Sequence, residues 1–142
     1  MIEIPGISEG LQVIENTLTD GIPVNVSLLF LPEQYEAAAL EELRGIDKRI
    51  EKGLNPDIRS VASVFVSRWD KEITGMAPAN LRNILGNTVM QKVYHSYRGI
   101  LRSQWVQRVI FVAFPKRLLR VSTGTKDRDL PDTLYVHDLG AL

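Results

Sequence analysis

One stretch decides the fold that this sequence predicts: Val61-Ala62-Ser63-Val64-Phe65-Val66-Ser67-Arg68. It is a nearly continuous apolar run, rich in β-branched residues, and turn-forming residues lie before it at 55–57 and after it at Asp70. Such a run predicts a strand that is buried on both faces, as in parallel sheets. Its hydroxyl groups and its guanidinium lie toward the carboxyl end, where parallel strands present residues to ligands. We therefore expect the functional site of this chain at that end.

Strand and helix patterns alternate on either side of this stretch. Helices are predicted to begin at Ser8 and Pro32 and to end before Gly21 and Gly53. A helical stripe covers 89–100, a further helix lies around 105–109, and 70–86 is predicted to be irregular. Strands are predicted at 1–4, 23–30, 61–68 and 117–122, and 132–139 is predicted to begin one more βα element.

The order β-α-β-α-β-α-α-β predicts an α/β fold with a parallel sheet and right-handed crossovers. Four such units are half of a (β/α)₈ barrel, which takes about 250 residues, so we expect residues 1–142 to form one half-barrel domain. An open half barrel leaves two strand edges unpaired and an apolar inner face exposed. The sequence therefore predicts self-association into a homo-oligomer, a dimer or larger.

Composition narrows the class of protein. Lys and Arg total 17, Asp and Glu total 17, and no long block of one charge occurs, so we expect neither nucleic acid nor a membrane as a partner. The chain has no cysteine, which indicates a reducing, cytoplasmic compartment and excludes thiolate chemistry. His95 and His137 are isolated from other ligands at metal spacing, so we expect no metal and no cofactor.

Several segments in the same order carry a family resemblance, which is weaker over 69–116. They are 2–6, 21–30, 61–68, 122–126 and 132–136. In these segments the chain resembles transaldolase. The resemblance implies a (β/α)₈ barrel that transfers a dihydroxyacetone unit between sugar phosphates of the pentose phosphate pathway through a lysine Schiff base. It also implies that this chain carries the fourth to seventh strands of that barrel, and that the catalytic acids of the first three strands have no counterpart here.

The resemblance places the Schiff-base lysine of the family at Glu3. A carboxylate cannot form an imine, so the covalent chemistry of the family is closed at this position. Ile7 also replaces a hydroxyl residue that usually follows the lysine strand. Glu3 is then either a solvated acid near the chain terminus, which we favour, or a barrel-facing carboxylate with a raised pKa.

Asn25 and Ser27 match residues that position the catalytic water and the substrate hydroxyls in the family. They share one face of a predicted strand by the two-residue period. Buried polar groups need hydrogen-bond partners, so the alternative is that these side chains satisfy each other or the backbone.

The remaining matches concern substrate binding. Ser63 and Phe65 correspond to residues that line the pocket of the family, and Arg68 to an arginine that binds the substrate phosphate. Arginine suits this task because its planar fork donates two parallel, charge-assisted hydrogen bonds. Ser122 and Lys126 lie in a loop of small residues that helps to hold the phosphate in the family and that can present backbone N–H groups to an anion.

Three functions remain open from the sequence. The chain is a transaldolase-like protein that binds a sugar phosphate but is inactive as a transferase. Alternatively, it is an enzyme that uses Glu3 for non-covalent sugar-phosphate chemistry, an isomerisation or a retro-aldol cleavage. The third possibility is an oligomeric binding or assembly module.

Overall fold

The computed structural model describes residues 1–109, 113, 116–125 and 129–137. Within these residues, one four-stranded sheet has the spatial order β1-β2-β3-β4, and every neighbouring pair is parallel. The predicted parallel α/β fold is therefore confirmed. The strands are β1 (Ile2–Pro5), β2 (Val24–Leu29), β3 (Val61–Phe65) and β4 (Arg117–Val121).

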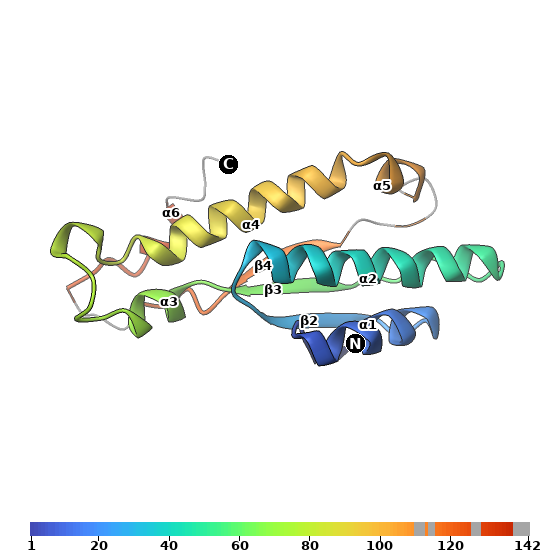
Figure 1. Ribbon diagram of the computed structural model, residues 1–142, viewed down its shortest axis with the longest axis horizontal. Helices are drawn as coiled ribbons and strands as arrows, with labels where there is room; N and C mark the ends of the chain where they lie inside the picture. Colours follow the sequence, from blue (N-terminus) through green and yellow to red (C-terminus); the bar gives the residue numbers. More distant parts are fainter. Residues whose placement is uncertain (110–112, 114–115, 126–128, 138–142) are drawn as a thin grey trace.

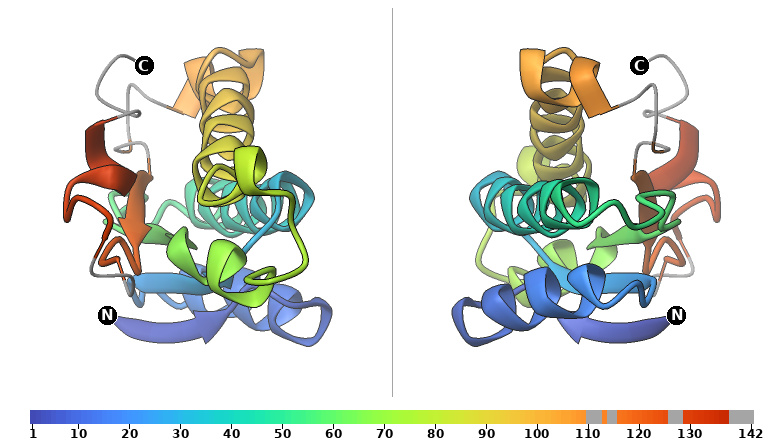
Figure 2. Two further views of the ribbon diagram at one scale, coloured as in Figure 1. Left: turned by 90° about the vertical axis from the view of Figure 1, so that its left-hand side faces the viewer. Right: turned by 90° about the vertical axis from the view of Figure 1, so that its right-hand side faces the viewer.

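Helices connect consecutive strands and cover one side of the sheet. Figure 1 shows α1, α2 and α4 running beside the strands, and the end-on views of Figure 2 show them in an arc on one side of the strand layer. The helices are α1 (Ser8–Thr19), α2 (Pro32–Glu51), α3 (Ser67–Glu72), α4 (Leu85–Leu101), α5 (Gln104–Val109) and α6 (Leu134–His137), with a 3₁₀ turn η1 (Ala79–Leu81).

The core lies between the sheet and these helices. Alternate strand residues face it, because successive side chains of a strand point to opposite faces. Together with apolar residues of α1, α2 and α4, they form one buried cluster, whose strand members include Ile4, Val24, Val26, Ala62 and Val64. The intervening residues Glu3, Asn25 and Ser63 therefore lie on the other face, which would be the inner face of a closed barrel.

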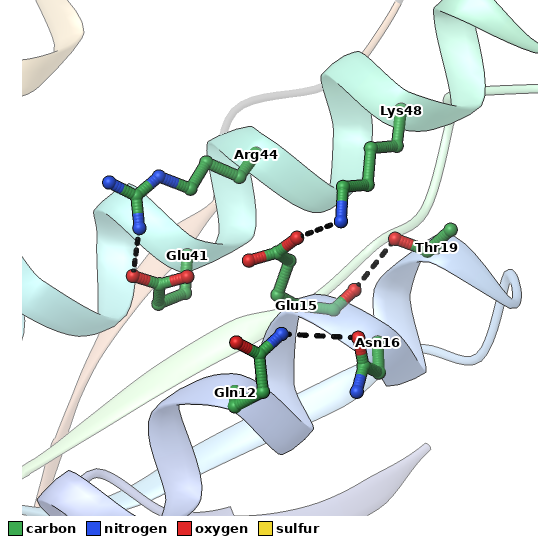
Figure 3. Close-up of polar contacts among 7 residues, drawn as sticks. All are labelled: Gln12, Glu15, Asn16, Thr19, Glu41, Arg44 and Lys48. Carbon is green, nitrogen blue, oxygen red and sulfur yellow. Dashed lines mark hydrogen bonds and ion pairs between the residues drawn. The ribbon is translucent and has the colours of Figure 1, made fainter.

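Polar side chains tie α1 to α2 at the edge of this core. The carboxylate of Glu15, which is buried, forms an ion pair with Lys48 of α2, and Figure 3 shows the two side chains pointing toward each other. On α2, Glu41 and Arg44 form a second ion pair with an N···O distance of 2.5 Å. The two helices pack closely here, since a Cβ added at Gly45 would lie 2.9 Å from the carbonyl oxygen of Glu15.

Three predicted boundaries are corrected by the structure. The strand expected over 61–68 ends at Phe65, and Ser67 and Arg68 begin α3 instead. Val66 already has helical dihedral angles, although its backbone N–H still donates a hydrogen bond to the carbonyl oxygen of Val121, the last residue of β4. The segment 70–86 contains the end of α3, the turn η1 and the start of α4. Of the βα element expected over 132–139, residues 134–137 are the helix α6.

The sheet stays open in the described part of the chain. The strands β1 and β4 each have one neighbouring strand, so each leaves one edge without a strand partner among these residues. Ile2 on β1 and Leu119 on β4 are 45% and 37% exposed. Four parallel strands with their helices thus form an unclosed sheet, with half the strand number of an eight-stranded barrel. None of the helices in the described ranges combines the length and the apolar character needed to cross a membrane.

Candidate functional site

Three of the predicted site residues lie next to one another on the open face of the sheet. Glu3 of β1 is in register with Asn25 of β2. Ser63 of β3 donates a hydrogen bond from its Oγ to the Oδ1 of Asn25, at 2.8 Å. Asn25 is half-buried and Ser63 buried, whereas Glu3 is exposed. The sheet register therefore creates a row of polar groups, with an acid at its solvent end.

The hydrogen bond to Ser63 decides between the two interpretations of Asn25 in part. Its amide oxygen accepts a hydrogen bond from Ser63, whereas the alternative named Ser27 or the backbone as the partner. The amide NH₂ of Asn25 has no hydrogen-bond acceptor among the described residues. Since Asn25 is only half-buried, this donor can serve water or a bound hydroxyl group.

A β-bulge follows Asn25 in the same strand. The register between β2 and β3 shifts between Val26 and Leu29, and Leu28 adopts a left-handed conformation with φ of 55°. Bulges re-aim neighbouring side chains, and Ser27, which is buried, lies directly before the shifted residue. Asn25 and Ser27 thus both lie on β2, and Ser27 is the more buried of the two side chains.

Phe65 and Arg68 come together at the carboxyl end of β3. The guanidinium carbon of Arg68 lies 5.3 Å from the centre of the Phe65 ring, a cation–π arrangement. Phe30, which follows β2, packs against Phe65 with ring centres 5.4 Å apart, and Trp69 meets Phe30 edge-on at 6.2 Å. The indole of Trp69 also donates a hydrogen bond to the Phe30 carbonyl oxygen at 3.0 Å. This aromatic cluster holds the exposed Arg68 at a fixed place beside the sheet.

Arg68 also lines a cavity of about 350 Å³. The other walls come from the loop after β2, from the start of α2 and from α3, and they include Phe30, Gln34, Trp69 and Glu72. These four residues are not among the site residues predicted from the sequence. The signal that the sequence offers is their position, since Phe30 directly follows β2 and Trp69 lies in the helix that comes shortly after β3.

Ser122 meets the start of α3. Its Oγ lies 3.0 Å from the Oγ of Ser67, and its carbonyl oxygen accepts a hydrogen bond from the Ser67 N–H at 2.9 Å. Ser122 has a left-handed backbone with φ of 55°, which is unusual for serine and is maintained by these contacts. The structure thus joins Ser122 to the neighbour of Arg68 and not to Arg68 itself. Lys126, the other predicted loop residue, lies outside the described residues.

The arrangement suits anion and hydroxyl recognition. It offers one exposed guanidinium, amide and hydroxyl groups on adjacent strands, and an aromatic wall. Among the described residues, no group of three or more His, Asp and Glu side chains is placed to hold a metal ion. The acidic residue among these groups is Glu3. Its side chain has no amine that could attack the carbonyl carbon of a substrate.

Comparisons with known proteins identify relatives of this chain. The family model described as transaldolase/fructose-6-phosphate aldolase matches residues 1–142. A transaldolase of Thermobifida fusca is 39% identical over 150 residues, which cover 99% of this chain and 41% of that protein. A transaldolase of Trichodesmium erythraeum is 36% identical over 156 residues, which cover 98% of this chain and 41% of that protein.

The chain spans about two fifths of the length of the curated relatives that it matches. Its open sheet of four parallel strands alternating with helices is consistent with half of an α/β barrel of that kind. The match extends over all 142 residues, including the divergent middle of the chain. This chain belongs to the transaldolase/fructose-6-phosphate aldolase family.

Proposed function

We propose that this transaldolase-like chain binds a sugar phosphate of the pentose phosphate pathway and does not act as a dihydroxyacetone transferase. The single observation that carries the proposal is the placement of Arg68. Its guanidinium is exposed, is held over Phe65, and lines a cavity at the carboxyl end of β3. A planar guanidinium at such a place favours a phosphate ligand.

The hydroxyl groups of the sugar would meet the open face of the sheet. Asn25 and Ser63 lie there, on the two strands that lead into Phe30 and Phe65. Amide and hydroxyl side chains can donate to and accept from sugar hydroxyls. In the proposed complex, the phosphate group of the ligand lies at α3 and its carbon chain lies over β2 and β3.

The loss of transfer activity is proposed from Glu3. The resemblance aligns Glu3 with the Schiff-base lysine, and a carboxylate has no amine to attack the ketose carbonyl. Within the described residues, no side chain forms an ion pair or a hydrogen bond with the Glu3 carboxylate, and the residue is exposed. An exposed, solvated carboxylate is poorly suited to general acid–base catalysis, so this placement favours binding over the alternative of non-covalent lyase or isomerase chemistry.

Two further proposals concern the state of the protein. We propose that copies of the chain associate through the open edges of β1 and β4, which carry the exposed residues Ile2 and Leu119. We also propose a cytoplasmic location, because the sequence has no cysteine and therefore gains nothing from an oxidising compartment.

The experiment that tests the binding proposal is a calorimetric titration with fructose 6-phosphate. We expect saturable binding that Arg68→Ala weakens by at least tenfold, since a charge-assisted pair to phosphate is lost; such a pair contributes about 1.5–3 kcal/mol. The matched control is Arg102→Ala, which removes an exposed arginine directly after α4. Equal affinity of wild type and Arg68→Ala, or equal losses in both variants, would refute the proposal.

A further inference from the structure

We propose that a second cavity, on the opposite side of α3 from Arg68, binds a small molecule through its phosphate group. This cavity has a volume of about 470 Å³ and lies between α3, the segment that follows it, and residues of the chain around α6. Its polar lining consists mainly of Ser67, Asp70, Lys71, Arg82, Asn83 and Tyr135. Small-molecule sites have volumes of about 300–1,000 Å³, so the cavity has room for a phosphorylated metabolite.

The helix α3 separates this cavity from the one beside Arg68. The second cavity is lined by Ser67, Asp70, Lys71 and Thr74, which are spaced three, one and three residues apart. Arg68, Trp69 and Glu72 line the first cavity. Side chains three and four residues apart share one face of a helix, so the two sets point away from each other. A ligand of the second cavity therefore does not contact Arg68.

The floor of the second cavity is preorganised around Asp70. This buried carboxylate accepts hydrogen bonds from the backbone N–H of Leu85 to Oδ1 at 3.0 Å and of Gly86 to Oδ2 at 3.1 Å. Tyr135 of α6 lines the same cavity as Asp70. Burial, and then the negative charge of Asp70, raise the pKa of Tyr135, so the phenol keeps its proton and can donate it in a hydrogen bond.

These contacts leave the cavity attractive to an anion. The charge of Asp70 is offset by the first N–H groups of the 17-residue helix α4, where the helix dipole favours a negative group. Lys71 and Arg82 line the wall, are exposed, and form no ion pair with any described residue. The cavity therefore has two cationic side chains and one carboxylate whose charge is already offset, and this balance favours a phosphate ligand. The planar guanidinium of Arg82 can bind a phosphate through two hydrogen bonds, and the ammonium group of Lys71 adds a second positive charge.

The test is a titration of the ¹⁵N-labelled full chain followed by two-dimensional NMR, with inorganic phosphate and with fructose 6-phosphate as probes. We expect saturable shifts of the amide signals of Lys71, Gly75 and Asn83. The double variant Lys71→Ala/Arg82→Ala should weaken this binding by at least tenfold. Lys92→Ala/Arg102→Ala is the matched control, because it removes two exposed cations of the α4 region.

The variant Arg68→Ala separates this proposal from the proposed function. It should leave the shifts around Lys71 and Asn83 unchanged while weakening the binding that perturbs the Phe65 and Trp69 signals. If fructose 6-phosphate binds more tightly than inorganic phosphate, the cavity also contacts the sugar part of the ligand. If the two affinities are equal, the cavity recognises the phosphate group alone. The proposal is overturned if Lys71, Gly75 and Asn83 do not shift with either probe, if their shifts survive the double variant, or if Arg68→Ala abolishes them.

Discussion

Gly86 shows how a single residue sets the geometry beside the second cavity. A Cβ at this position would lie 2.5 Å from the carbonyl oxygen of Val66 and 2.7 Å from the Oδ2 of Asp70. The absence of a side chain allows the first turn of α4 to approach α3 and to bind the Asp70 carboxylate with its N–H groups. A backbone oxygen cannot move aside easily, so any larger residue must separate the two helices.

We predict that Gly86→Ala destabilises the protein by about 1–3 kcal/mol, because the added methyl group overpacks a buried contact. The control lies in the same helix, at Gly99, where an added Cβ meets no atom within 4 Å. Gly99→Ala should therefore raise the stability, by up to about 1 kcal/mol, through its higher helix propensity. Urea denaturation of the two variants measures both effects, and similar changes in both would contradict the packing argument.

The sequence was informative about residues where a local pattern decides their place. The two-residue period of β2 predicted that Asn25 and Ser27 share one face of the strand, and the structure places Asn25 on the face away from the core. The partner of Asn25 was not predictable in the same way, because Ser63 lies 38 residues away and reaches it only through the register of β2 against β3. The contact between Ser122 and Ser67 likewise joins the ends of two strands, and no local pattern indicates it.

Between the helices α1 and α2, the edge of the interface is polar, and its contribution to the free energy of unfolding depends on pH. The hydrogen bond from Lys48 holds the pKa of Glu15 below its usual value. The unfolded chain, in which this carboxyl has a pKa of about 4.3, therefore takes up protons first as the pH falls. The stabilisation by this pair is complete above that pH and is lost as the pH falls through the lower pKa of the folded state.

We predict that Glu15→Gln lowers the free energy of unfolding at pH 7 and has a smaller effect at pH 2.5. The effect at pH 7 should be below about 1 kcal/mol, because Lys48 is half exposed and its charge is screened by solvent. Lys48→Met should remove the same pH-dependent part of the free energy of unfolding. Denaturation series at the two pH values measure these differences, and an effect of Glu15→Gln that is independent of pH would contradict the assignment.

The elements themselves were largely predictable, apart from the three boundaries that the structure corrects. Helices α1 and α2 and strand β2 match their apolar periodicity and their turn signals to within a few residues. One of these boundaries is the end of β3, where the apolar run continues to Val66 although the strand stops at Phe65. The backbone N–H groups of Val66 and Ser67 bond to Val121 and Ser122 at the end of β4, and a pattern within 61–68 carries no information about these distant partners.

At the scale of the whole molecule, the open sheet is the dominant feature. Its parallel order followed from the alternation of elements along the chain, and the structure confirms it. What the sequence did not reveal is how the second cavity forms, because it depends on α6 folding back onto α4, where Asn87 donates a hydrogen bond to the Leu134 carbonyl oxygen at 3.2 Å. This contact joins residues 47 positions apart.

The open edges lead to a prediction about assembly. Unpaired edges of parallel strands expose rows of N–H and C=O groups and tend to acquire a partner strand. We predict that light scattering of the purified chain gives at least twice the mass of one chain. Leu119→Lys, which places a charge on the exposed face of β4, should shift the protein toward monomers. A monomer that remains well folded at all concentrations would contradict the proposed association.

We expect this family member to bind a ketose phosphate without forming an imine. Intact-mass spectrometry after borohydride reduction in the presence of fructose 6-phosphate tests it most directly, because borohydride converts an imine into a stable amine adduct. We predict that the mass of the wild-type chain does not change under conditions in which calorimetry shows the ligand bound. A saturable increase by the mass of one reduced ketose phosphate, with the adduct on a single lysine, would contradict this expectation and would show that a lysine of this chain forms the imine.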